Sequence, residues 1–282
     1  MEKQKRLVAI NDVSGFGRCS LTVASPLISA SGIECVCMPT AVLSTHTGGF
    51  TGYTYRDLTN DMPLITEHWK SINLKFDAIY SGFLGSIEQI DIVKDFVKKF
   101  KTESNILIAD PCMADLGKMY VLFNEEFAKK MTSLCSMADI ILPNITEACF
   151  MTDTEYIDGV QTREYIEKLL NLLMDLGVKN VVLTGVSFEE NQIGAACMGE
   201  DRIAQYYFNE KIPENYHGTG DVFASAFCGG LLNGFSLFDS MCIAVRFTCD
   251  CIKRTKESSP DTHYGVDFER GIPYLLKELK KI

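Results

Sequence analysis

The chain has 282 residues, a length that suits one large α/β domain or two small ones. Its formal net charge of −10 is the opposite of what a nucleic-acid-binding surface needs, so that class of partner is not expected. The eleven cysteines are odd in number and scattered, and this predicts reduced thiols in a cytoplasmic protein rather than a disulfide framework.

Along the chain, short β-rich runs alternate with amphipathic segments. Strands are predicted at 6–10, 33–38, 77–82, 105–110, 139–144 and 180–185, with helices between them at 18–31, 56–72, 86–101, 124–137 and 161–176. Apolar strands separated by helices are typical of a mostly parallel sheet with helices on both faces. Residues 192–210 then predict a hairpin that turns near 199–201, which adds an antiparallel pair at one edge.

Three more helices are predicted after the hairpin, at 219–233, 237–256 and 266–281. The apolar run 222–238 contains Gly, Ser and Asn, so it predicts a buried helix rather than a membrane span. The N-terminal apolar run is too short for the core of a signal peptide. No linker or repeat divides the chain, so we expect a single α/β domain over residues 1–282.

Polar residues stand where several predicted strands end. Ligands of open α/β sheets bind beyond the carboxyl ends of the strands. Core packing needs no polar groups there, although solvation of loops would account for some of them. The residues at these ends are Asn11, Asp12, Asp110, Asn144, Thr184 and Gly185.

The stretch "HGTGD" (217–221) places one carboxylate, that of Asp221, at the start of a predicted helix. The small residues Gly218, Thr219 and Gly220 leave room for an anion, and the amide N–H groups of a helix N-terminus attract one. A carboxylate there can take a proton from an alcohol while the amides hold a transferring phosphoryl group. The alternative is an ordinary aspartate that caps a helix.

Two other phosphate-binding patterns are excluded. The only Gly-Lys pair, Gly117-Lys118, is followed by Met and lacks the upstream glycine of a Walker A loop. The stretch "SGFGRCS" (14–20) imitates a dinucleotide fingerprint, but Ser20 stands where the third glycine belongs. A Rossmann dehydrogenase is therefore not favoured.

The stretch "GTGDVFASAF" resembles the signature of the ribokinase-like kinases, and "PNITEA" (143–148) resembles their Asn-x-x-Glu motif. The resemblance implies a three-layer ribokinase-like sandwich with Asp221 as catalytic base. It also implies that Asn144 and Glu147 organise Mg²⁺ near the phosphates of ATP. A strand end followed by a helix cap would explain "PNITEA" equally well.

Within this superfamily the vitamin B6 kinases are the most similar. "STHTGGFTGY" (44–53) resembles their His-Thr-Gly segment, which implies that His46 and Thr47 lie near the pyridine ring. "SGFLGS" (81–86) resembles their Thr-Gly-Tyr segment, with Phe83 in the tyrosine position. "DPCMADLGKMYV" (110–121) resembles their Asp-Pro-Val-Met run. It implies that Asp110 and Asp115 lie near the metal and phosphates and that Tyr120 lies on an ATP flap. Thr184 and Gly185 would contact the nucleotide.

One segment departs from that branch. "NDVSG" (11–15) is more similar to the opening of hydroxymethylpyrimidine kinases, which places Asp12 and Ser14 beside the substrate and leaves its identity open. The expected function is ATP- and Mg²⁺-dependent phosphorylation of the 5′-hydroxymethyl group of pyridoxal, pyridoxine or pyridoxamine. A monovalent cation such as K⁺ is a further candidate cofactor, and the resemblance implies a homodimer. The alternatives are hydroxymethylpyrimidine kinase and a non-catalytic vitamin B6 binding protein.

Overall fold

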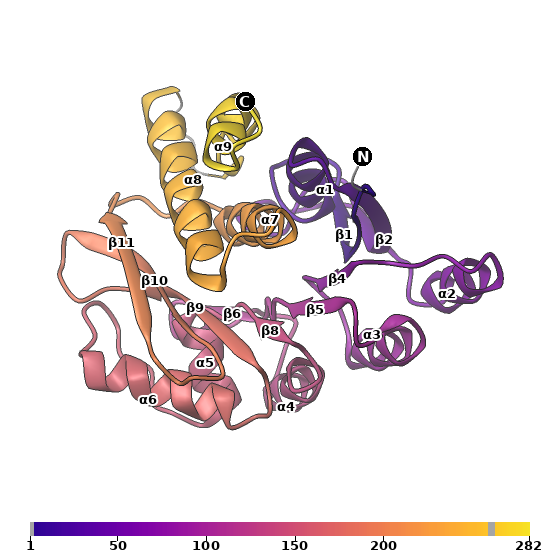
Figure 1. Ribbon diagram of the computed structural model, residues 1–282, viewed down its shortest axis with the longest axis horizontal. Coiled ribbons are helices and arrows are strands. Elements are labelled where there is room, and N and C mark those ends of the chain that lie inside the picture. The colour runs from indigo at the N-terminus through magenta and orange to yellow at the C-terminus, as the bar shows by residue number, and fades with distance from the viewer. Residues whose placement is uncertain (1–2, 259–262) are drawn as a thin grey trace.

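The architecture is a nine-stranded sheet between two layers of helices (Figure 1). The computed structural model describes residues 3–258 and 263–282. The strands of the sheet are β1 (Arg6–Ser14), β2 (Glu34–Leu43), β3 (Tyr55–Asp57), β4 (Ala78–Ser81), β5 (Ile106–Ala109), β8 (Ile140–Ile141), β9 (Asn180–Val186), β10 (Gln192–Met198) and β11 (Gln205–Glu210). Their order across the sheet is β11-β10-β9-β8-β5-β4-β1-β2-β3.

The centre of the sheet is parallel and both edges are antiparallel. The pairs from β9 through β8, β5, β4 and β1 to β2 are parallel. The predicted hairpin is confirmed as β10 and β11, and it closes one edge. The short β3 pairs antiparallel with β2 at the other edge. The predicted α/β fold class, with a mostly parallel sheet and an edge hairpin, is confirmed.

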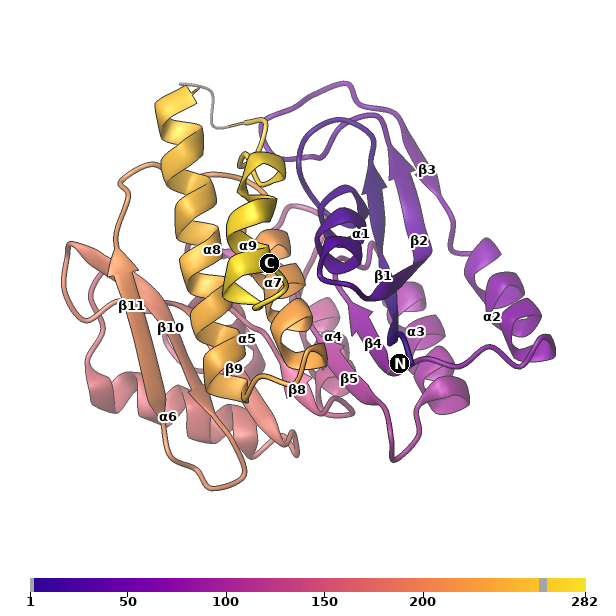
Figure 2. The ribbon, with the colours of Figure 1, turned by 45° about the horizontal axis from the view of Figure 1, so that its top comes forward.

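Helices cover both faces of the sheet (Figures 1 and 2). On one face lie α1 (Leu21–Ala30), α7 (Thr219–Leu232), α8 (Leu237–Ser258) and α9 (Ile272–Glu278), and on the other α2 (Asp61–Ser71), α3 (Ile87–Phe100), α4 (Glu125–Cys135), α5 (Ile145–Thr152) and α6 (Arg163–Met174). Each face has its own apolar core. One sheet thus lies between the two cores, and a single domain over residues 1–282 stays a prediction.

Helix α7 is apolar all round because it is covered on several sides. It packs between α1 and α8 against the sheet. A Cβ on Gly230 would meet the Cα of Ser240 in α8 at 3.1 Å, and one on Gly229 would meet the Oγ of Ser31 at 2.6 Å. These small residues let the neighbouring backbones approach closely. Close packing fixes the direction in which the N-terminus of α7 points.

Two helix predictions were wrong in part. The predicted helix 56–72 is β3 followed by α2, because the Tyr55–Asp57 backbone pairs with the end of β2 and Asp57 accepts hydrogen bonds from Thr59. The predicted helix 266–281 is a 3₁₀ turn (Glu269–Gly271) followed by the short α9. The small hairpin of β6 (Ala114–Asp115) and β7 (Lys118–Met119) was not predicted, nor was α5. No helix in the described ranges is long and apolar enough to cross a membrane.

Candidate active site

The N-terminus of α7 forms the loop that the sequence predicted. Gly218 is its N-cap residue with φ of 75°, a conformation that favours glycine. A Cβ there would lie 1.9 Å from the carbonyl oxygen of Arg18, so only glycine fits without a backbone shift. Apart from its chain neighbours and the backbone of its own helix, no described atom lies within 4 Å of a Cβ built on Gly220, so space is open beside the chain there. The loop combines exposed amides with room for an anion.

Asp221 lies in the first turn of α7 and is held from two sides. The amide nitrogen of Asn11 donates to its Oδ1 at 3.3 Å. Burial raises its pKa to about 6, and the charge of Asp12 adds to the rise, while hydrogen bonds from the Ser20 backbone N–H and from Asn11 oppose it. A carboxylate with a pKa near 6 is largely ionised at pH 7 and still basic enough to accept a proton from an alcohol.

Three carboxylates converge on this end of the sheet from different elements. Asp110 follows β5, Glu147 lies in α5 and Asp221 in α7. Burial, then the charges of Glu147 and of Asp221, raise the pKa of Asp110 well above its ordinary value of 3.8. Burial raises the pKa of Glu147 to about 7. The sheet therefore brings together like charges that a cation would stabilise.

The Asn144 and Glu147 side chains form a complete capping box at the start of α5. Glu147 N–H donates to Asn144 Oδ1 at 2.9 Å, and Asn144 N–H donates to Glu147 Oε2 at 2.9 Å. The other oxygen, Glu147 Oε1, accepts from Met113 N–H at 2.9 Å. The structure therefore contains the helix cap that was the alternative interpretation of "PNITEA". The capping box holds Glu147 near Asp110, among the three carboxylates Asp110, Glu147 and Asp221.

The donor set can be compared with what Mg²⁺ requires. In the described ranges no group of three or more His, Cys, Asp and Glu side chains forms a ready-made metal site. Mg²⁺ commonly needs only one or two protein carboxylates beside the phosphates of its substrate. Neither Asp110 nor Glu147 takes part in an ion pair among the residues that the structure describes. Asp110 therefore fits a Mg²⁺ that arrives with a nucleotide, whereas Glu147, whose two oxygens accept backbone N–H bonds, fits contact through metal-bound water.

The residues predicted for ATP lie around this group. Asp115 lies in the β6–β7 hairpin and Tyr120 directly follows β7. Both residues are exposed. Gly117 N–H donates to Thr146 Oγ1 at 3.0 Å, which ties the hairpin to α5. Thr184, near the end of β9, forms a bridge with Asn144, and Gly185 beside it has φ of 80°.

Asp12 and Ser14 are buried rather than open to a ligand. The exposed fractions are 5% for Asp12 and 1% for Ser14. The Asp12 carboxylate accepts hydrogen bonds from Ser14 Oγ at 2.9 Å and from Ser20 Oγ at 2.5 Å. Both carboxylate oxygens are thus occupied, and Asp12 holds the loop that follows β1. Contact between Asp12 and the substrate ring stays a prediction.

His46, Thr47 and Phe83 lie on loops beyond the strand ends. His46 Nδ1 accepts from Gly48 N–H at 3.1 Å, so the proton of a neutral ring is on Nε2, which is 2.7 Å from the carbonyl oxygen of His263. Both ring nitrogens are therefore bound to backbone. Thr47 is exposed, and the Phe83 ring lies 5.7 Å from that of Phe123. Recognition of the ring by these three residues also stays a prediction.

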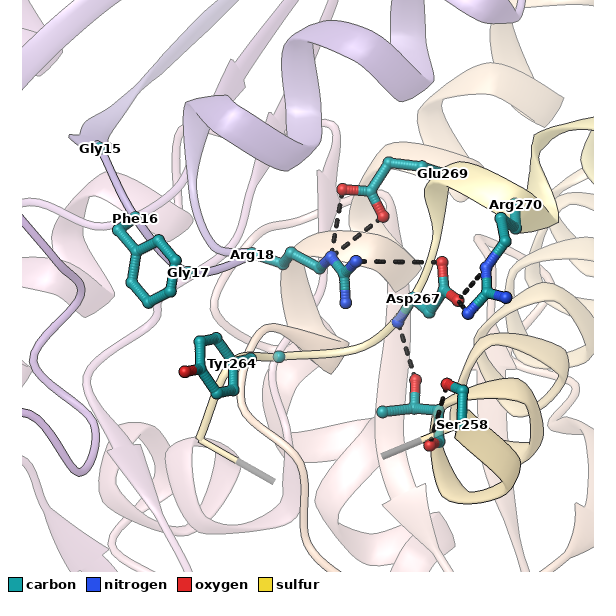
Figure 3. Close-up of a pocket in the computed structure, with 11 residues that line it drawn as sticks. Gly15, Phe16, Gly17, Arg18, Ser258, Tyr264, Asp267, Glu269 and Arg270 are labelled. Atoms are coloured by element: carbon teal, nitrogen blue, oxygen red, sulfur yellow. Dashed lines mark hydrogen bonds and ion pairs between the residues drawn. The ribbon is translucent and has the colours of Figure 1, made fainter. Parts of the chain in front are cut away.

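A cavity of about 490 Å³ is lined by residues 15–18 of the β1–α1 loop, by the end of α8 and by residues between Tyr264 and Arg270 (Figure 3). The carbonyl of Arg18 packs against Gly218, whereas its guanidinium lies in the cavity and pairs with Glu269 at 3.0 Å. Arg270 pairs with Asp267 on the same side. Paired charges leave no net charge for an anion, so the candidate active site is the loop at Asp221 and not this cavity.

The comparisons with known proteins agree with this geometry. The family model described as phosphomethylpyrimidine kinase matches residues 27–266. The chain belongs to this kinase family. A Bacteroides thetaiotaomicron VPI-5482 protein, provisionally named a phosphomethylpyrimidine kinase and crystallised with pyridoxal, is 36% identical. The two structures superpose with a TM-score of 0.92 over 97% of this chain and 96% of that one.

Two further similar proteins carry different names. Pyridoxal kinase from Lactobacillus plantarum is 29% identical, with a TM-score of 0.89 over 98% of both chains. The chloroplastic thiamine biosynthetic bifunctional enzyme TH1 of Arabidopsis thaliana is 24% identical over 242 residues, which are 81% of this chain and 43% of that enzyme. Across the first three curated relatives, the matched region spans 43% to 53% of their length. Proteins similar to this chain thus include kinases named for pyridoxal and kinases named for hydroxymethylpyrimidine.

Several residues of the site were not predicted from the sequence. Asn11 was noted at a strand end but given no role, and it is fully buried against Asp221. Ser20, singled out only as a missing glycine, has φ of 59° and contacts Asp12. The ring of His217 lies 5.4 Å from that of His46. Only the strand-end position of Asn11 was a usable signal, because the other contacts depend on loop conformation.

Proposed function

We propose that this protein transfers the γ-phosphoryl group of ATP to the 5′-hydroxymethyl group of a vitamin B6 vitamer. The observation that carries the proposal is a partly buried carboxylate, Asp221, in the first turn of α7 beside an open glycine loop. Asp221 accepts the proton of the substrate hydroxyl, and the amides of Gly218 to Asp221 stabilise the charge of the transferring group. A binding protein would need no such base.

The remaining residues hold the nucleotide in this proposal. Asp110 and Glu147 hold the Mg²⁺ that accompanies ATP, and Asn144 orients Glu147 through the capping box. Bound Mg²⁺ neutralises charge on the phosphates. Asp115, Tyr120, Thr184 and Gly185 line the nucleotide side. A monovalent cation such as K⁺ and a homodimer belong to the same proposal, because both follow from the resemblance to vitamin B6 kinases.

The vitamer class rests on two findings. A protein 36% identical over nearly the whole chain crystallises with pyridoxal. The glycine loop at 218–221 reads Gly-Thr-Gly-Asp, whereas the hydroxymethylpyrimidine kinases that "NDVSG" resembles usually have Gly-Thr-Gly-Cys there. Hydroxymethylpyrimidine is the second candidate, because the matched family model is named for phosphomethylpyrimidine kinase. Both are flat rings with a hydroxymethyl group, so shape alone discriminates weakly between them.

Competition between the two substrates tests the proposal. The purified protein is given MgATP with equal amounts of pyridoxal and hydroxymethylpyrimidine, and both phosphorylated products are measured. We expect kcat/KM for the best B6 vitamer to exceed that for the pyrimidine by about tenfold or more, the equivalent of one good hydrogen bond. A preference for the pyrimidine would transfer the function to the second candidate. Binding of pyridoxal without ADP formation would support a binding protein instead.

A further inference from the structure

Asn11 stands at the point where β1 departs from regular pairing with β2. Asn11 pairs with Pro39, whereas Val13 pairs with Val42, so the register shifts between these two residues of β1. Irregularities of this kind re-aim side chains and are frequent beside active sites. The exposed fraction of Asn11 is 0%. A fully buried amide at such a position needs partners for both of its ends.

The orientation of the Asn11 amide follows from its partners. Its Oδ1 accepts from Asp12 N–H at 3.0 Å and from Phe83 N–H at 2.9 Å. Two N–H donors on one side require the oxygen there, so the NH₂ group faces the other way. On that side Nδ2 lies 3.3 Å from Asp221 Oδ1. The amide therefore donates to Asp221.

Gly82, after β4, keeps this amide in place. A Cβ on Gly82 would lie 2.3 Å from Asn11 Nδ2, so the amide packs directly against the bare Cα. The Asn11 side chain thus makes three hydrogen bonds and packs against the Cα of Gly82, and together these contacts fix its position. Asn11 donates to one oxygen of Asp221, and the Ser20 backbone N–H also donates to this carboxylate.

We infer that Asn11 is a positioning residue, which fixes the carboxylate of Asp221 for proton transfer by donating to its Oδ1. The inference rests on the proposed role of Asp221 as base, and it is the same for a B6 or a pyrimidine substrate. Asn11 acts through Asp221 and needs no contact with the substrate. A hydrogen bond to the ionised carboxylate also favours the ionised form, so it keeps the base available at lower pH.

The test compares Asn11→Ala with Asn11→Asp. The Asp variant keeps the shape and the acceptor for both backbone N–H groups, but it loses the donor and places a second carboxylate beside Asp221. We expect kcat to fall about tenfold in Asn11→Ala and further in Asn11→Asp, with little change in the KM for ATP. The acidic limb of the pH–kcat profile should move to higher pH in both variants, further in Asn11→Asp.

A purely structural role predicts the reverse order. Asn11→Asp would then be more active than Asn11→Ala, because it retains both backbone hydrogen bonds, and the pH profile would not move. Either result would overturn the inference. Asn105→Ala is the matched control, because Asn105 is a buried amide that donates to Phe76 and Phe100 carbonyls at the opposite end of the sheet. It should lower stability without moving the pH profile.

A titration without substrate keeps this test separate from the proposed function. The ¹³C carboxyl resonance of Asp221, assigned by its loss in Asp221→Asn, is followed against pH in the wild type and in Asn11→Ala. We expect a higher pKa for Asp221 in the variant. An unchanged titration would contradict the inference even if the protein is a kinase. A shifted titration would uphold the contact even if neither substrate is phosphorylated. Should Asn11→Ala fold poorly, Gly82→Ala displaces the same amide and should shift the titration in the same direction.

Discussion

Replacing Glu147 with glutamine should change stability in a way that depends on pH. Glu147 is 2% exposed and accepts backbone N–H bonds on both carboxylate oxygens. A glutamine keeps one acceptor oxygen but turns an NH₂ group toward the second N–H. The unsatisfied buried donor should cost about 1–3 kcal/mol of unfolding free energy at any pH.

The buried charge of Glu147 destabilises the wild type at high pH, and the glutamine variant lacks this charge. Its pKa rises from 4.5 to about 7 on folding. Since the folded state binds this proton more tightly, the contribution of Glu147 to wild-type stability is greatest below pH 4.5 and is lost as pH rises through 7. Between pH 5 and pH 8 this linkage removes roughly 2–3 kcal/mol of unfolding free energy from the wild type. The glutamine variant does not lose this part of its unfolding free energy, because glutamine does not ionise.

Urea unfolding at pH 5 and pH 8, with EDTA and without nucleotide, measures the difference. We expect Glu147→Gln to be less stable than the wild type at pH 5 and about equal to it at pH 8. Glu125→Gln, at an exposed position in the first turn of α4, is the control and should show the same small effect at both pH values. An equal penalty for Glu147→Gln at both pH values would refute the reasoning about buried charge.

Three further predictions concern the metal and the glycine loop at residues 218–221. Glu147→Gln should raise the Mg²⁺ concentration needed for half-maximal rate at saturating ATP, because a neutral amide is a poorer partner for the metal or its bound water. An unchanged Mg²⁺ titration would leave Glu147 as a helix cap only. Gly218→Ala should lose activity. It should also lose about 1–3 kcal/mol or more of unfolding free energy, because Gly218 has φ of 75° and the added Cβ would lie 1.9 Å from the Arg18 carbonyl oxygen. Gly220→Ala should lose activity with little loss of thermal stability, because its Cβ points into open space; equal stability losses would argue against a strained loop.

Much of the fold could be predicted from the sequence because the strands of the parallel centre are apolar runs between turn signals. The errors lie where tertiary contacts decide the local structure. Tyr55 to Asp57 form a strand only because β2 offers a free edge, and Ala114 to Met119 form a hairpin anchored by Thr146. Neither contact leaves a periodic pattern in the sequence.

The site shows the same division. Asp221, Asn144 and Glu147 could be found because their motifs have fixed spacing at the ends of elements. The contact between Asn11 and Asp221 joins residues 210 positions apart, so no local pattern contains it. The resemblance also placed Asp12 beside a ligand, and this stays a prediction; in the structure Ser14 and Ser20 donate to its two oxygens.

The most direct test of the central claim is the turnover of Asp221→Asn with MgATP and pyridoxal. Asparagine keeps the size of the side chain at the start of α7 but cannot accept the proton of the alcohol. We expect kcat to fall at least about a hundredfold, since loss of a general base costs on the order of 10²–10⁴ in rate, while the Kd for ATP stays nearly unchanged. Turnover close to that of the wild type would contradict the account and leave Asp221 with a structural role only, as the partner of Asn11.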